Sequence, residues 1–280
     1  MDDGGAARMS VSRWARIAAT VAVTSFLALL VSWRIDGGRW VHVESPSMGT
    51  AAPVGSLLWV KPVDTETLAE GDFITFRPPG SDALYSHRVL AVYDDGSFTT
   101  KGDIPGPDPW RLTAADVVGE VRMTWWGAGW LVVAAPVLLG GFAIVVAARA
   151  AVDPAWRFPV TMVLAATVVS IAVSVYHPLI GAQRIAFSPE GSTARATYVG
   201  TGLLPVRLTT HHGESAILAA GEVGTVVVRD PDEDGRLEVT LEPALPMWWW
   251  AVLVLGCLAP AAVRTAGDRR PRDSAPAVSH

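Results

Sequence analysis

Four uncharged apolar stretches constrain the fold of this 280-residue chain more than any other feature. They cover residues 17–33, 126–148, 158–176 and 247–263. The shortest has 17 residues, which as an α-helix rise about 26 Å, close to the hydrocarbon thickness of a bilayer. A helix buried in a soluble core is seldom as long and as apolar on every face. The pattern therefore predicts four transmembrane helices.

The placement of basic residues indicates which side of the membrane each connecting segment faces. Residues 1–16, 149–157 and 264–280 hold nine basic residues in 42 positions, whereas residues 34–125 and 177–246 hold 13 in 162. The denser set is expected in the cytoplasm, as the N-terminus, a short loop and a disordered tail. Both sparser segments are then extracytoplasmic, in a multi-pass protein of the cell membrane.

Composition excludes several classes of protein. A net charge of −5 argues against a nucleic-acid-binding protein. The single cysteine, Cys257, lies in an apolar run, so neither an intrachain disulfide nor a cysteine-based metal site is expected. No small-x-small cleavage motif precedes Trp33, which favours a retained anchor over a cleaved signal peptide for residues 17–33.

The first outer segment predicts a β-rich domain. Its β-prone runs alternate with turn formers, and no long amphipathic helix interrupts them. The expected strands are residues 57–60, 73–76, 88–92, 97–100 and 117–123. A generic small β-domain tethered to a membrane would fit this pattern without any catalytic role.

Three short segments of this domain carry the residue types of a serine hydrolase, in the order serine, histidine, aspartate. They are Ser45-Pro46-Ser47-Met48-Gly49, Ser86-His87-Arg88-Val89, and Thr100-Lys101-Gly102-Asp103 with the following Pro107-Asp108-Pro109-Trp110. A serine hydroxyl is a poor nucleophile until a neighbouring base takes its proton, and histidine suits that task near neutral pH. A carboxylate then fixes the imidazole tautomer and stabilises the imidazolium that forms.

The ordered motifs resemble the signal peptidase I family over about residues 43–124. The matching segments are Ser-x-Ser-Met, Val-Gly-Ser-Leu (54–57), Lys-Pro-Val-Asp (61–64), Glu-Gly-Asp-Phe-Ile-Thr-Phe (70–76), His-Arg-Val (87–89), Thr-Lys-Gly-Asp (100–103) and Val-Val-Gly-Glu-Val (117–121). The family divides by its base, which is lysine in the bacterial type. It is histidine in the endoplasmic-reticulum and archaeal type, which also occurs in some Gram-positive bacteria. With His87 in the His-Arg-Val motif, the chain resembles the second type.

The resemblance implies a role for each candidate residue. Ser47 is the expected nucleophile and His87 the base, whereas Lys61 and Lys101 are interpreted as structural. Ser45 lies two positions before the nucleophile, where related enzymes can offer an oxyanion donor beside the backbone N–H of Ser47; a plain turn residue is the alternative. Asp108 is the expected partner of His87, with Asp103 either structural or a support for the site. Ile104-Pro105 departs from the family pattern, which leaves the choice of aspartate open.

The second outer segment, residues 177–246, predicts a small β-sandwich-like domain of unknown role. Its β-prone runs are residues 195–199, 206–210, 224–228 and 237–241. His211-His212 is interpreted as a solvated loop pair, because no cysteine or suitably spaced acid accompanies it. Asp230, Asp232 and Asp234 alternate as in a calcium loop, but the ligand at the twelfth position is missing, so an acidic turn is favoured.

The expected architecture is thus an α+β membrane protein. Four transmembrane helices carry an extracytoplasmic all-β signal-peptidase-like catalytic domain and a second small extracytoplasmic β-domain. The resemblance implies a serine endopeptidase that needs no metal and no cofactor. Its partners would be the signal peptides of secretory preproteins and the lipid bilayer, and an association with the protein-export translocon is compatible with them. A catalytically silent scaffold displaying two β-domains, and a peptidase for a narrow set of secreted clients, remain open alternatives.

Overall fold

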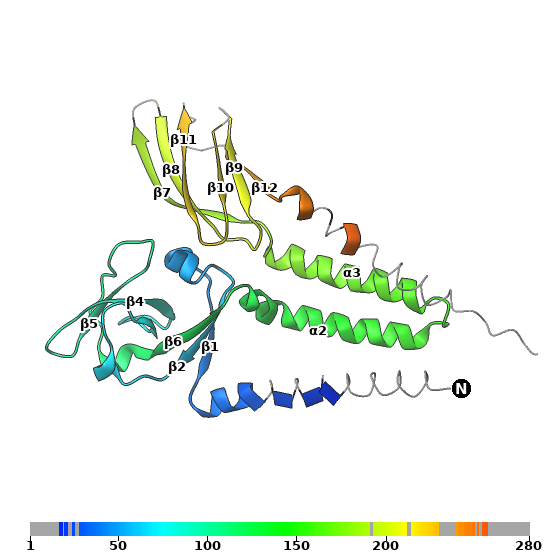
Figure 1. The fold of residues 1–280 in the computed structure, drawn as a ribbon, viewed down its shortest axis with the longest axis horizontal. Coiled ribbons are helices and arrows are strands. Elements are labelled where there is room, and N and C mark those ends of the chain that lie inside the picture. Colours follow the sequence, from blue (N-terminus) through cyan, green and yellow to red (C-terminus); the bar gives the residue numbers. More distant parts are fainter. Residues whose placement is uncertain are drawn as a thin grey trace, which may run out of the picture.

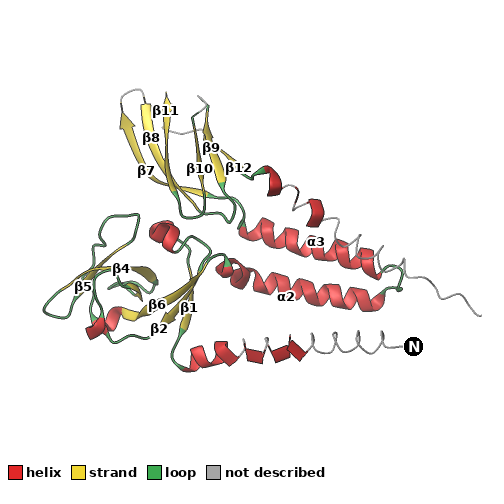
Figure 2. Cartoon of the chain, in the orientation of Figure 1, coloured by secondary structure: helices red, strands yellow, loops and turns green. Residues whose placement is uncertain are grey.

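The computed structural model describes residues 17–18, 20–21, 24–25, 28–190, 193–211, 214–229, 239–249, 251 and 254–256. The chain is α+β, and its sheets are antiparallel apart from isolated bridges. Figure 1 shows two β-domains at one end of a set of helices. Figure 2, coloured by secondary structure, shows that the strands lie in these domains and the long helices outside them.

The first β-domain is built on one six-stranded sheet with the order β1-β2-β6-β3-β4-β5. Its strands are β1 (Arg39–His42), β2 (Leu57–Lys61), β3 (Phe73–Phe76), β4 (Tyr85–Val92), β5 (Phe98–Lys101) and β6 (Val117–Trp125). Three short 3-10 helices connect them: η1 (Pro46–Ala51), η2 (Thr65–Thr67) and η3 (Ala114–Asp116). The five predicted strands are confirmed with slightly different ends, whereas β1 was not predicted.

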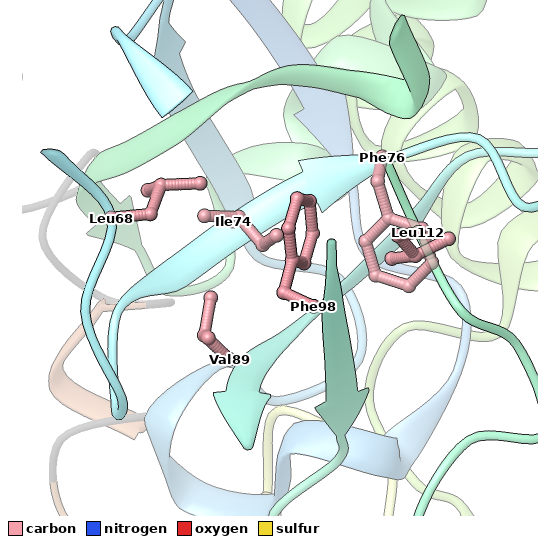
Figure 3. Close-up of a cluster of buried hydrophobic side chains, with 6 residues drawn as sticks. All are labelled: Leu68, Ile74, Phe76, Val89, Phe98 and Leu112. Carbon is pink, nitrogen blue, oxygen red and sulfur yellow. The ribbon is translucent and has the colours of Figure 1, made fainter. Parts of the chain in front are cut away.

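Two apolar clusters hold this domain together. Figure 3 shows the first, in which six buried side chains from β3, β4, β5 and the adjoining loops meet: Leu68, Ile74, Phe76, Val89, Phe98 and Leu112. The second cluster includes Met48 of η1 and consists of Val43, Met48, Ala52, Leu58 and Val60. Because side chains alternate between the two faces of a strand, every second residue of these strands points into a cluster.

Two described helices are long and apolar enough to cross a membrane, α2 (Ala128–Ala151) and α3 (Arg157–Tyr176). They correspond to the apolar stretches 126–148 and 158–176. The two helices pack against each other, and a Cβ added at Gly141 of α2 would lie 2.3 Å from the Val168 side chain of α3. Small residues allow such close helix packing. Large apolar side chains such as Leu139 and Phe142 point away from the protein and are about two-thirds exposed.

The other two apolar stretches are described only in part. Residues 28–35 are helical and lead into β1, and residues 247–249 and 254–256 are helical after the second β-domain. Trp59 of β2 ties the first of these helices to the sheet, because its ring lies 5.0 Å from that of Trp33 and 4.8 Å from that of Trp125. The helix before the first β-domain is therefore packed against the sheet through a row of tryptophan rings.

The second β-domain consists of two three-stranded sheets, β11-β8-β7 and β10-β9-β12. Its strands are β7 (Ala182–Glu190), β8 (Thr193–Gly200), β9 (Val206–Thr210), β10 (Ser215–Leu218), β11 (Val223–Arg229) and β12 (Val239–Pro243). Side chains from both sheets share one buried cluster of Ala196, Val206, Leu208, Leu218 and Val226. Strands β7 and β10 were not predicted. His212, the predicted acidic turn at 231–235 and the tail 264–280 lie outside the described residues.

The buried cluster of Figure 3 predicts unequal effects for two leucines of the first β-domain. Leu112 is fully buried, whereas Leu90 of β4 is 41% exposed. Leu112→Ala should lower the free energy of unfolding by about 2–5 kcal/mol, because it removes buried apolar surface and leaves a cavity. Leu90→Ala, the matched control, should change it little. Denaturant unfolding followed by tryptophan fluorescence measures both, and equal effects would contradict this packing.

Candidate active site

Ser47 lies in η1, the short helix between β1 and β2. Pro46 starts this helix in a position that suits its fixed φ angle. Met48 is buried in the second apolar cluster and anchors the turn from inside. Gly49 interrupts the helix with φ 50° and ψ −131°, a conformation that only glycine adopts without strain. Pro46, Met48 and Gly49 therefore fix the backbone on which the Ser47 side chain is carried.

His87 lies on β4, where strand alternation turns its ring toward the interior of the domain. The residue is only 5% exposed. The rings of Phe76 and Tyr85 each meet the imidazole edge-on, with centroids 6.2 Å away. These aromatic neighbours limit the orientations that the imidazole can take.

Ser47, His87 and Asp108 form one hydrogen-bonded chain. The Ser47 Oγ lies 2.9 Å from His87 Nε2, and His87 Nδ1 lies 2.7 Å from Asp108 Oδ2. The same carboxylate oxygen accepts a hydrogen bond from the Thr100 hydroxyl at 2.6 Å. Because a carboxylate only accepts, Nδ1 carries the proton and Nε2 is left to accept from the serine hydroxyl. A base that accepts from the hydroxyl, and a carboxylate that orients the base, form the arrangement that activates serine in Ser-His-Asp hydrolases.

Ser45 contributes a second hydroxyl beside the nucleophile. Its Oγ lies 3.2 Å from Ser47 Oγ, and either atom can donate in this pair. Since the Ser47 hydrogen is directed at His87, Ser45 is left as the donor. The Ser45 hydroxyl thus lies close beside the Ser47 oxygen.

Asp103 does not take part in this chain of hydrogen bonds. Its two carboxylate oxygens accept from the Arg88 guanidinium, at 2.9 Å from Nε and 3.4 Å from Nη2. His87 and Arg88 are neighbours on β4 and point to opposite faces of the strand. Each therefore meets a different aspartate, with Asp108 on the histidine side and Asp103 on the arginine side.

The two lysines of the domain lie elsewhere in the structure. Lys61 Nζ is 3.5 Å from Asp36 Oδ2 and lies over the Trp33 ring. Lys101 pairs through its backbone with Arg88 of β4 and forms an isolated bridge with Pro107. The position next to the Ser47 hydroxyl is occupied by His87.

The Lys-Gly-Asp segment packs directly on η1, the turn that carries Ser47. The Ile104 N–H donates to the Ser47 carbonyl at 3.0 Å. A Cβ added at Gly102 would lie 2.8 Å from that same carbonyl oxygen. Glycine is therefore needed here for close approach, and Ile104-Pro105, the departure from the family pattern, is part of the contact. The sequence did not reveal this contact or the Thr100 hydrogen bond.

Ser47 and His87 lie on the wall of an open cleft of about 260 Å³. Strand β1, at the edge of the sheet, forms part of the same wall. The apolar lining includes Met48, Ala52, Leu58, Phe73, Leu84 and Tyr85. The Ser47 hydroxyl thus lies beside an apolar surface and the strand edge formed by β1.

The part of the chain that the structure describes contains no set of side chains arranged as metal ligands. No three His, Cys, Asp or Glu side chains there are arranged to hold a metal ion. His211 is described as a turn residue after β9.

No model of a known protein family matches this chain, and no curated protein matches it closely enough to count as a relative.

Proposed function

We propose that this chain is a membrane-bound serine endopeptidase of the signal peptidase I type, which removes N-terminal signal peptides from exported preproteins. The observation that carries the proposal is the hydrogen-bonded chain from Ser47 through His87 to Asp108, on the wall of a cleft. A silent scaffold has no use for a buried histidine that bonds a serine hydroxyl on one side and a carboxylate on the other. The side chains of His87 and Asp108 are 6% and 9% exposed, and burying such polar groups costs stability that only their hydrogen bonds offset. A catalytic role explains why the chain carries this buried pair.

The geometry supports a two-step acyl transfer. His87 Nε2 takes the proton as Ser47 Oγ attacks the scissile carbonyl, and Asp108 stabilises the imidazolium that results. The Ser45 hydroxyl and the Ser47 backbone N–H are the donors for the oxyanion. His87 then gives its proton to the leaving amine, which leaves an acyl group on Ser47. A water molecule, deprotonated by His87, hydrolyses this ester and restores the serine.

The cleft suits an extended peptide with small side chains. Strand β1 lies at the sheet edge, where an extended chain can add as a further strand through backbone hydrogen bonds. Ala52, Leu58 and Phe73 line a shallow apolar floor beside Ser47. A signal peptide has small residues just before its cleavage site, and small side chains fit a shallow floor of this kind.

The arrangement of the helices favours an active site at the membrane surface. Residues 28–35 lead into β1, β6 leads into α2, and α3 leads into β7, so both β-domains lie at the same end of the helices. With the sparse distribution of Arg and Lys, this end is assigned to the extracytoplasmic side. The proposal thus keeps four membrane spans, with the bilayer and translocated preproteins as partners.

Replacing the nucleophile tests the proposed function directly. Ser47→Ala should abolish cleavage, because no covalent path remains, whereas Ser45→Ala should lower the rate roughly 10²–10³-fold by removing one oxyanion donor. Purified protein is incubated with a panel of preproteins, and the N-termini of the products are sequenced. Cleavage by Ser47→Ala at the wild-type rate would end the proposal. A panel in which only a few preproteins are cut would assign the enzyme to a narrow set of clients.

The two aspartates give a sharper test of the geometry. Asp108→Asn should lower the rate by roughly 10⁴-fold, because an amide no longer fixes the productive histidine tautomer. Asp103→Asn, the matched control, keeps its shape but weakens only the contact with Arg88, so cleavage should stay near the wild-type rate. The same preprotein assay measures both. Dependence on Asp103 with a tolerant Asp108 would contradict the assignment of the acid.

The proposed topology can be checked with reporter fusions at Asp95, Ala151 and Asp232. Reporters that are active only outside the cytoplasm should work at Asp95 and Asp232 and fail at Ala151. Cytoplasmic exposure of Asp95 would place the cleft in the wrong compartment for exported substrates.

A further inference from the structure

The second β-domain contacts the nucleophile turn through one glycine. Gly221, with φ +77°, lies so close to η1 that an added Cβ would be 2.3 Å from the Gly49 carbonyl oxygen and 2.7 Å from the Thr50 nitrogen. Figure 1 shows η1, the short blue helix near the top of the first β-domain, directly beside the loops of the second. Both contact atoms of η1 are backbone atoms, so they cannot move aside by rotating a side chain.

The turn that carries Gly221 has a fixed position within the second β-domain. It covers residues 219–222 and joins β10 to β11. The Gly221 N–H donates to the Gly200 carbonyl at 2.8 Å, and the Gly200 N–H donates to the Glu222 carbonyl at 2.9 Å. The Glu222 carboxylate also accepts from the Ala219 N–H at 2.9 Å. The turn is therefore fastened to the end of β8 and presents a firm surface to η1.

Gly49 is enclosed from two sides by this arrangement. A Cβ added at Gly49 would lie 3.4 Å from both the Gly221 carbonyl oxygen and the Ile104 side chain. One neighbour belongs to the second β-domain and the other to the segment that bonds the Ser47 carbonyl. Because glycine can adopt many backbone angles, packing from two sides restricts Gly49 to the observed pair. The angles of Gly49 therefore depend on contacts from both domains.

We propose that the turn 219–222 holds Gly49, and with it the Ser47 backbone, in the geometry needed for oxyanion stabilisation, with Gly221 as the positioning residue. This inference rests on the proposed peptidase function. It gives the second β-domain a role in catalysis without any contact to substrate, since Gly221 does not line the cleft that holds Ser47 and His87. A disturbed contact should therefore lower kcat and leave KM nearly unchanged.

The test is Gly221→Ala in the full-length purified protein, compared with Gly96→Ala. Gly96 has nearly the same φ, +74°, but nothing lies within 4 Å of the Cβ added there. Both substitutions place a side chain at a positive φ, but only Gly221→Ala pushes on η1. We expect kcat to fall roughly 10- to 100-fold in Gly221→Ala, as for a small misplacement of a catalytic group. Gly96→Ala should keep the wild-type kcat and KM.

A second readout separates positioning from mere folding. A fluorophosphonate labels an activated serine without needing a preprotein, and Gly221→Ala should slow its reaction with Ser47 in parallel with kcat. Thermal unfolding should show a folded variant. Normal kcat and labelling in a folded Gly221→Ala protein would overturn the positioning role while leaving the peptidase intact. A wild-type protein that neither cleaves preproteins nor is labelled would overturn both.

If Gly221→Ala does not fold, Glu222→Ala decides. It removes the acceptor for the Ala219 N–H and loosens the turn without a clash. A lowered kcat with an unchanged KM supports positioning, and wild-type kinetics overturn it.

Discussion

The contact between Ser47 and His87 depends on the pairing of β6 with two other strands. Ser47 lies in η1, which connects β1 and β2, whereas His87 lies in the part of the sheet made by β3, β4 and β5. Strand β6 lies between β2 and β3 and pairs antiparallel with both. Gly119 permits this, since a Cβ there would lie 2.3 Å from the Lys61 carbonyl oxygen. The last strand of the domain thus brings Ser47 and His87 together, which gives the Val-Val-Gly-Glu-Val segment a physical role.

The buried pair of His87 and Asp108 is stable only because its polar atoms have partners. Each imidazole nitrogen has one partner, and Asp108 Oδ2 accepts from both His87 and Thr100. The backbone of Asp108 is also fixed, because its N–H donates to the Thr100 carbonyl at 2.9 Å. Such bonds offset the cost of removing a carboxylate from water. They also hold the imidazole in place before substrate arrives, which is how preorganised sites lower a barrier.

Periodicity and turn chemistry were enough to predict most strands, but not the contacts between distant segments. Strand β1 has only four residues, and β7 contains Pro189, which is unusual in a strand but tolerated because β7 lies at a sheet edge. The choice between Asp103 and Asp108 could not follow from spacing alone. It follows from the opposite directions of His87 and Arg88 on β4, a feature that needs the strand and its two loops in space.

The connection of the second β-domain at both ends explains how a single turn can act on η1. The chain enters the domain from α3 through β7 and leaves it through β12 toward the helical residues 247–249. A domain held by one linker could swing away, whereas two tethers at one end of the helices restrict its motion. Leu203 adds a further contact, because a Cβ at Gly127, just before α2, would lie 3.0 Å from its side chain. Helices α2 and α3, which are long and apolar enough to cross a membrane, therefore also limit how far Gly221 can move from Gly49.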